Sequence, residues 1–155
     1  ESFSDAAKGT TIASTMYASG VDVIYQAAGG TGTGVFTAAK EVNEKLDADS
    51  DKKVWVIGVD RDQNAEGNYT SSDKKKSNFV LTSTIKKVGT VVKDIANGQL
   101  KGDKFEGGST KTYGIKDGGV DIVTSKLPSD IKDAVEKAKE QIKNGELKPT
   151  DGLSK

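Results

Sequence analysis

The sequence has 155 residues, the length of one ordinary domain, and balances 23 Lys and Arg against 23 Asp and Glu. A net charge near zero argues against nucleic acid as a main partner, because no surplus of positive charge exists to displace counterions. Cysteine and histidine are absent. Their absence excludes disulfides, cysteine nucleophiles, zinc–thiolate sites and His-based triads. No run approaches 18 apolar residues, so we expect no membrane span.

The first predicted element is a helix from about residue 6 to residue 19. Ser4-Asp5 provides an N-cap, and Gly20 follows the helix as a stop signal. Its apolar face is expected to comprise Ile12, Ala13, Met16 and Tyr17. The chain starts at Glu1 without an initiator Met, and we expect it to be a fragment or a processed product.

A strand, a glycine loop and a helix are predicted next. The apolar run Val21–Ala28 indicates a buried strand, and helical spacing of apolar residues continues to about Leu46. Between them lie Gly29, Gly30, Gly32 and Gly34. A glycine loop at a helix N-terminus offers unpaired N–H donors to a ligand. The same pattern is also typical of a tight turn with close helix–strand packing, and the glycines alone do not decide between the two.

A second buried strand is expected over residues 53–59, followed directly by Asp60 and Asp62. The resulting αβαβ order is typical of a parallel sheet covered by helices, so the predicted fold class is α/β. Ligands of such sheets lie beyond the carboxyl ends of the strands. The glycine loop and the two aspartates both fall there. A carboxylate at this place suits acceptance from sugar hydroxyls; the alternative is a solvated turn.

The second half of the chain is expected to continue this pattern. The polar stretch Asn64–Ser77 is predicted as a long loop, functional or mobile, and Asn78–Ser83 as a third strand. Lys86 and Lys87 would open the next helix and point into the crevice or into water. The remaining expected elements are a helix over residues 85–96 ended by Asn97-Gly98, a hairpin or crossover formed by residues 110–115 and 120–123, and a last helix from about residue 127 to residue 144.

Other catalytic and phosphate-binding patterns are missing from the sequence. Hydroxyl side chains such as Ser83 have no histidine to activate them, which argues against a serine hydrolase. Neither G-x-x-x-x-G-K-[ST] nor G-x-G-x-x-G occurs. Phe3, just before the first helix, could stack on a planar ligand or belong to the core.

Several stretches together resemble the basic-membrane-protein (BMP) family, the nucleoside-binding lipoproteins of ABC importers. They are Ser2-Phe3-Ser4-Asp5 with Lys8-Gly9, Gly20–Ile24 with Ala28–Gly32, Ile57–Gln63, Leu81–Ser83 with Lys86, and Gly114 with Asp117–Val120. The resemblance implies a periplasmic-binding-protein type I (Rossmann-like) fold, in which two α/β lobes of three-layer parallel sheet architecture enclose the ligand. Residues 1–155 would then be the C-terminal portion, comprising one lobe, the hinge crossover and the C-terminal helix, without the N-terminal lobe.

The resemblance also implies a ligand site with no catalytic residue, metal or cofactor. Phe3 would stack on a purine base, and Gly29 or Gly30 would contribute backbone contacts. Asp60 would accept from the ribose hydroxyls, with Asp62 as the second choice, and Lys86 would reach the ligand. The implied partners are a purine nucleoside of the inosine, guanosine and adenosine class and an ABC permease. The full-length protein would be extracytoplasmic and held at the cell membrane by an N-terminal lipid anchor outside this chain, and the isolated piece could self-associate.

Two alternative functions follow from parts of the same pattern. A sugar-binding protein or a regulator domain would share the fold, although Phe3 favours a planar base over a bare sugar. The run Gly29–Gly34 also resembles the signature loop of tubulin-like GTPases, which cradles nucleotide phosphates. The chain is short for such a domain, and the other motifs of that class are missing.

Overall fold

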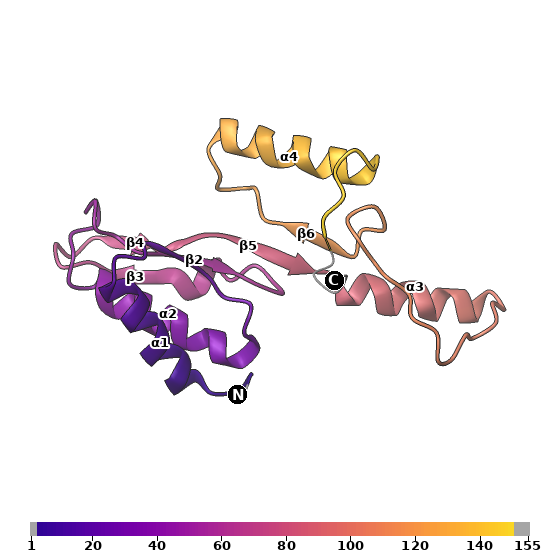
Figure 1. Cartoon of the computed structure of the whole chain (residues 1–155), viewed down its shortest axis with the longest axis horizontal. Coiled ribbons are helices and arrows are strands. Elements are labelled where there is room, and N and C mark those ends of the chain that lie inside the picture. The colour runs from indigo at the N-terminus through magenta and orange to yellow at the C-terminus, as the bar shows by residue number, and fades with distance from the viewer. Residues whose placement is uncertain (1–2, 151–155) are drawn as a thin grey trace. The chain divides into compact units, whose positions relative to one another are not determined.

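The computed structural model describes residues 3–150 and divides the chain into two compact units, Glu1–Thr84 and Ile85–Lys155. Figure 1 shows the elements along the chain. The structure contains a four-stranded sheet with the order β1-β2-β5-β6 and a second sheet formed by β3 and β4. The elements are α1 (Ala6–Ala18), β1 (Val23–Tyr25), η1 (Gly29–Gly32), α2 (Thr33–Asn43), β2 (Trp55–Gly58), η2 (Asn64–Gly67), β3 (Asn68–Thr70), β4 (Lys76–Asn78), β5 (Val80–Lys86), α3 (Val88–Leu100), β6 (Val120–Ile122) and α4 (Ser129–Lys143).

The parallel α/β arrangement predicted for the first unit is confirmed. β1 pairs with β2 in parallel, with Ile24 opposite Val56, and β2 pairs with β5 in parallel, with Gly58 opposite Ser83. The strands are shorter than expected. β1 covers only three residues of the run Val21–Ala28, and its side chains alternate between buried and exposed positions. One face of β1 therefore packs against the core, whereas the sequence had suggested burial on both faces.

Helix α1 begins as predicted, since the Asp5 side chain accepts a hydrogen bond from the Lys8 N–H at 2.9 Å. Gly20, with φ of +95°, follows its last turn. The predicted apolar face is half wrong. Ala13 and Tyr17 are buried, but Ile12 and Met16 are exposed. The buried stripe of α1 instead comprises Gly9, Ala13 and Tyr17, and α2 lies close to the first part of this stripe, where a Cβ on Gly34 would come within 2.8 Å of the Gly9 backbone.

Phe79 is the centre of the aromatic packing in the first unit. It is fully buried, its ring centroid lies 6.3 Å from that of Phe36 on α2, and it lies 5.8 Å from that of Tyr69 on β3. These spacings fall in the favourable range for aromatic pairs. The Phe79 backbone also connects η2 to β2, donating to the Gly67 carbonyl and accepting from the Val56 N–H.

The prediction of a long polar loop over Asn64–Ser77 is wrong. This stretch forms the short helix η2 and most of an antiparallel hairpin, in which Tyr69 lies opposite Ser77. The hairpin is ordered by a single large side chain, Tyr69, which packs on Phe79 and is only 5% exposed. One buried aromatic residue among polar neighbours leaves no apolar periodicity for a sequence pattern to detect.

The second unit departs further from expectation. Lys86 ends β5 and Lys87 occupies the N-cap position of α3, so neither residue lies inside the helix. α3 runs through Asn97-Gly98, the expected stop, and ends at Leu100, with Gly102 at φ +87°. Residues 110–115 form no strand, and of the expected hairpin only β6 is present. The last helix, α4, was predicted to within about two residues at its start and one at its end.

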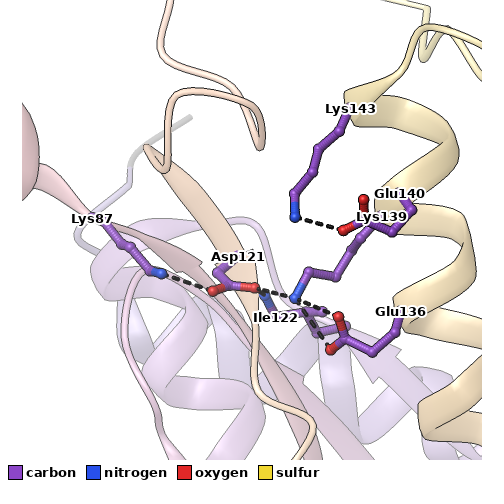
Figure 2. A network of polar contacts seen from close by, with 7 residues as sticks. All are labelled: Lys87, Asp121, Ile122, Glu136, Lys139, Glu140 and Lys143. Atoms are coloured by element: carbon purple, nitrogen blue, oxygen red, sulfur yellow. Dashed lines mark hydrogen bonds and ion pairs between the residues drawn. The ribbon is translucent and has the colours of Figure 1, made fainter.

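Asp121 on β6 is the centre of an ion-pair network in the second unit (Figure 2). Its carboxylate accepts from the ammonium groups of Lys87, at 2.7 Å, and Lys139 on α4, at 2.9 Å. Lys139 also pairs with Glu136 at 3.1 Å. The hydrogen bonds from Lys87 and Lys139 hold the pKa of Asp121 well below its usual range. The network thus fixes α4 and the start of α3 to the same strand.

We expect Asp121→Asn to destabilise the docking of α4 by about 1 kcal/mol at pH 7, because two ion pairs lose their shared charge. A carboxyl with a lowered native pKa stabilises the fold above its unfolded pKa of about 3.9, and this contribution is lost as the pH falls further. The destabilisation should therefore be complete at pH 7 and shrink below about pH 4. Hydrogen exchange of the Ser129–Lys143 segment measures it. Glu140→Gln, which removes only the exposed Lys143–Glu140 pair at 2.7 Å, is the matched control and should change little.

Candidate ligand-binding site

The glycine loop uses two of its glycines for packing. A Cβ atom on Gly32 would lie 1.7 Å from Oε1 of the buried Gln26, and one on Gly34 would lie 2.1 Å from the Ala6 carbonyl oxygen of α1. The tight-turn interpretation therefore holds for this half of the loop. Gly29 and Gly30 are different, because both are exposed, and Gly29 has φ of +55°.

Phe3 lies against Gly29 and Gly30. Its carbonyl oxygen accepts from the Thr31 N–H at 3.0 Å, and a Cβ on either glycine would lie 3.2 Å from the same oxygen. The Phe3 side chain is 76% exposed, which rules out the core alternative within the described part of the chain. The structure therefore places an exposed aromatic ring beside exposed glycine backbone, as a site for a planar ligand requires.

The turn after β2 carries the two aspartates, and they differ in conformation. Asp60 is exposed and has φ of +70°, a region that non-glycine residues rarely adopt. The Arg61 N–H donates to the Val59 carbonyl across it at 2.8 Å. Asp62 instead accepts from the Asn64 N–H at 2.9 Å through its side chain, at the start of η2. The two aspartates therefore differ, since the Asp62 carboxylate holds the Asn64 N–H, whereas Asp60 lies at the positive-φ position of the turn.

A buried polar network lies under both parts of the site, and the sequence analysis missed it. Gln26, just after β1, donates through Nε2 to Oε1 of Gln63 at 2.8 Å. The Gln63 N–H donates to the hydroxyl of Ser83 on β5 at 3.1 Å. All three residues are buried, and their hydrogen bonds connect the segment after β1, the turn after β2 and the middle of β5. One signal was available, since Gln26 is one of two polar residues, with Asp22, in the otherwise apolar run Val21–Ala28.

The predicted site residues fall into two groups. Phe3, Gly29, Gly30, Asp60 and Asp62 belong to the first unit, at the edge where β1 and β2 end. Lys86, the last residue of β5, belongs to the second unit and is exposed. Between residues 3 and 150, no three acidic side chains cluster as metal ligands would. No helix in that range has the length and apolar character to cross a bilayer.

The family profile described as "ABC transporter substrate-binding protein PnrA-like" matches residues 1–150. The chain belongs to this Bmp family. A relative from Lactococcus lactis subsp. cremoris, described as "ABC transporter nucleoside-binding protein BmpA", is 60% identical over 94% of the chain. The "CD4+ T-cell-stimulating antigen" of Listeria monocytogenes is 47% identical, and "Basic membrane protein A" of Borreliella afzelii is 34% identical, each over 94% of the chain. The chain spans 41% of the length of the first relative and 40% of the other two.

Solved structures of other proteins share the fold of this chain. A transcriptional activator of the comK gene from Bacillus halodurans superposes with a TM-score of 0.72 at 22% identity, covering 96% of this chain and 46% of that one. A solute-binding protein of an ABC transporter system from Aeropyrum pernix gives a TM-score of 0.71 at 24% identity, covering 99% of this chain and 47% of its own. At these identities the similarity establishes the fold alone, an α/β periplasmic-binding-protein fold.

Proposed function

We propose that this Bmp-family chain is the C-terminal portion of a two-lobe substrate-binding protein that delivers purine nucleosides to an ABC permease without catalysis. The observation that carries the proposal is the exposed Phe3 ring packed beside the exposed Gly29-Gly30 backbone, at the sheet edge where the Asp60 turn also lies. The lactococcal relative is described as nucleoside-binding, which supports the same ligand class. The intact protein would act outside the cytoplasm, held at the membrane by a lipid anchor.

Each part of the ligand has a proposed partner. The purine stacks on Phe3, and the backbone of Gly29 or Gly30 contacts the ligand where no side chain intervenes. Asp60 accepts from the ribose hydroxyls, a charge-assisted interaction that a neutral acceptor would make more weakly. Lys86 is a further proposed contact, as the family resemblance implies. Asp62, whose carboxylate accepts from the Asn64 N–H, is the second choice for the ribose contact.

The geometry of the glycine loop disfavours the GTPase alternative. A phosphate cradle needs backbone N–H groups directed at the ligand. Here Gly32 and Gly34 pack against Gln26 and α1, and the Thr31 N–H is used by the Phe3 carbonyl. The exposed ring of Phe3 favours a planar base over the bare sugar of the sugar-binding alternative.

Titration of the full-length protein with inosine, guanosine, ribose and GTP tests the proposal. We expect saturable binding of both nucleosides, measured by calorimetry and thermal shift, and none of ribose at the same concentrations. Tighter binding of GTP than of guanosine would contradict the nucleoside assignment. Binding of ribose as tightly as inosine would instead favour the sugar-binding alternative.

A further inference from the structure

Gln63 makes several hydrogen bonds beside the proposed site that no sequence pattern had indicated. Its carboxamide oxygen accepts two hydrogen bonds, from the Val59 N–H at 2.8 Å and from Gln26 Nε2 at 2.8 Å. Its own N–H donates to Ser83 at 3.1 Å. The side chain is nearly fully buried. Gln63 therefore closes the Val59–Gln63 turn on itself and connects it to the end of β1, through Gln26, and to the middle of β5, through Ser83.

The turn that Gln63 closes is strained at Asp60. The hydrogen bond from Arg61 N–H to the Val59 carbonyl spans two residues and is centred on Asp60, whose φ is +70°. This is a γ-turn of the rare form with positive φ. Such a conformation persists only where its surroundings fix it, and such strain is concentrated at functional sites. The Val59 N–H, bound by Gln63, lies immediately before the strained peptide.

The same side chain also connects the Asp60 turn to the glycine loop. Gln26, hydrogen-bonded to Gln63, occupies the space that a side chain at Gly32 would fill. Gly58, at the end of β2, also has no room for a side chain, because a Cβ there would lie 2.5 Å from the Ser83 hydroxyl and 2.9 Å from Gln63 Cβ. The glycine loop, the Gln26–Gln63 pair and the Asp60 turn thus form one continuous packed structure.

We infer that Gln63 is a positioning residue of the ligand site, which holds Asp60 in its strained conformation and fixes it relative to the glycine loop through Gln26. This inference rests on the proposed function, because it assigns Asp60 to the ribose hydroxyls. Gln63 itself does not touch the ligand. Its effect on binding comes from preorganisation: without it, the ligand must order the Asp60 turn as it binds.

A matched control for Gln63 exists at the other end of β2. Asn43 is fully buried, and its carboxamide accepts from the Val54 N–H at 3.0 Å and donates to the Val54 carbonyl at 2.9 Å. Both residues are buried amides that hold the backbone flanking the same strand. If the role of Gln63 were purely structural, its replacement and that of Asn43 should affect ligand binding similarly. Only Gln63, however, lies at the end of β2 that carries Asp60.

The experiment compares Gln63→Met and Asn43→Leu in the full-length protein. We expect both to lower the melting temperature, but only Gln63→Met to weaken inosine binding, by about tenfold. The loss should concern the ribose contact, so the preference for inosine over 2′,3′-dideoxyinosine should fall in Gln63→Met and remain in Asn43→Leu. In the Asp60→Ala background, Gln63→Met should cause no further loss of affinity, since the group it positions is gone. Ser83→Ala removes only the hydroxyl that accepts from the Gln63 N–H, so it should reduce the preference for inosine over 2′,3′-dideoxyinosine less than Gln63→Met does.

A readout without ligand completes the test. Hydrogen exchange of residues 59–63 in the unliganded protein should accelerate in Gln63→Met and stay unchanged in Asn43→Leu. The inference would be overturned if a folded Gln63→Met protein kept its affinity for inosine and its preference for inosine over 2′,3′-dideoxyinosine. If Asp60→Ala nevertheless lost inosine affinity in the same assay, the proposed function would stand. Absence of nucleoside binding by the unmodified protein would overturn the proposed function itself.

Discussion

Replacing Asp60 with alanine in the full-length protein is expected to weaken inosine binding by about 100-fold, because two charge-assisted hydrogen bonds to the ribose contribute about 3 kcal/mol together. Isothermal calorimetry with inosine measures the loss directly. The same substitution should leave the weaker affinity for 2′,3′-dideoxyinosine nearly unchanged, since that nucleoside lacks both hydroxyls. The expected loss thus distinguishes a ribose contact from a general disturbance of the site.

Two further variants separate binding from stability. Asp60→Gly removes the carboxylate and relieves the strain of a side chain at φ +70°, so it should stabilise the fold slightly and still lose inosine affinity. Asp62→Ala removes the acceptor used by the Asn64 N–H and should cost stability, with less than about a threefold change in affinity. The opposite ranking, with Asp62→Ala more damaging to binding than Asp60→Ala, would transfer the ribose contact to Asp62.

The parts of this fold that the sequence predicted are those determined by local chemistry. The Asp5 cap, the positive-φ Gly20 and the strand–loop–helix order around Gly29 all depend on residues within a few positions of one another. The rule that ligands lie at the carboxyl ends of parallel strands then placed Asp60 and the glycine loop at the same sheet edge. The structure confirms that edge.

The features that could not be predicted depend on residues far apart in the chain. Tyr69 orders a hairpin only because Phe79 is buried beside it. Gln26 and Gln63 are 37 positions apart and are both compatible with a solvated turn until β1 and β2 are known to be neighbours. The roles of Gly32 and Gly34 likewise depend on residues elsewhere in the chain. Their pattern left a ligand loop and a tight turn both open, and only the contacts with Gln26 and α1 show that packing requires them.

Gly34 gives the largest expected effect on stability. In an exposed helix, Gly→Ala stabilises by up to about 1 kcal/mol. At Gly34 the added methyl group would lie 2.1 Å from the Ala6 carbonyl oxygen and 2.4 Å from the Thr10 nitrogen of α1. Both are backbone atoms, which cannot rotate away. Overpacking of this kind costs about 1–3 kcal/mol and exceeds the gain in propensity, so we expect Gly34→Ala to destabilise the first unit by about 2 kcal/mol.

The matched control is Gly89→Ala, in α3, where an added methyl group has no neighbour within 4 Å. This variant should be neutral or stabilising by about 0.5 kcal/mol, as propensity alone predicts. Urea unfolding of Gly34→Ala is followed by Trp55 fluorescence, which reports on the first unit, and that of Gly89→Ala by far-UV circular dichroism, which includes α3 in the second unit. Gly34→Ala should also weaken inosine binding, because α2 must move away from α1 and carries the glycine loop with it. An unchanged urea midpoint for Gly34→Ala would show that the two helices can separate at little cost, and that their close approach does not hold Gly29 and Gly30 in place.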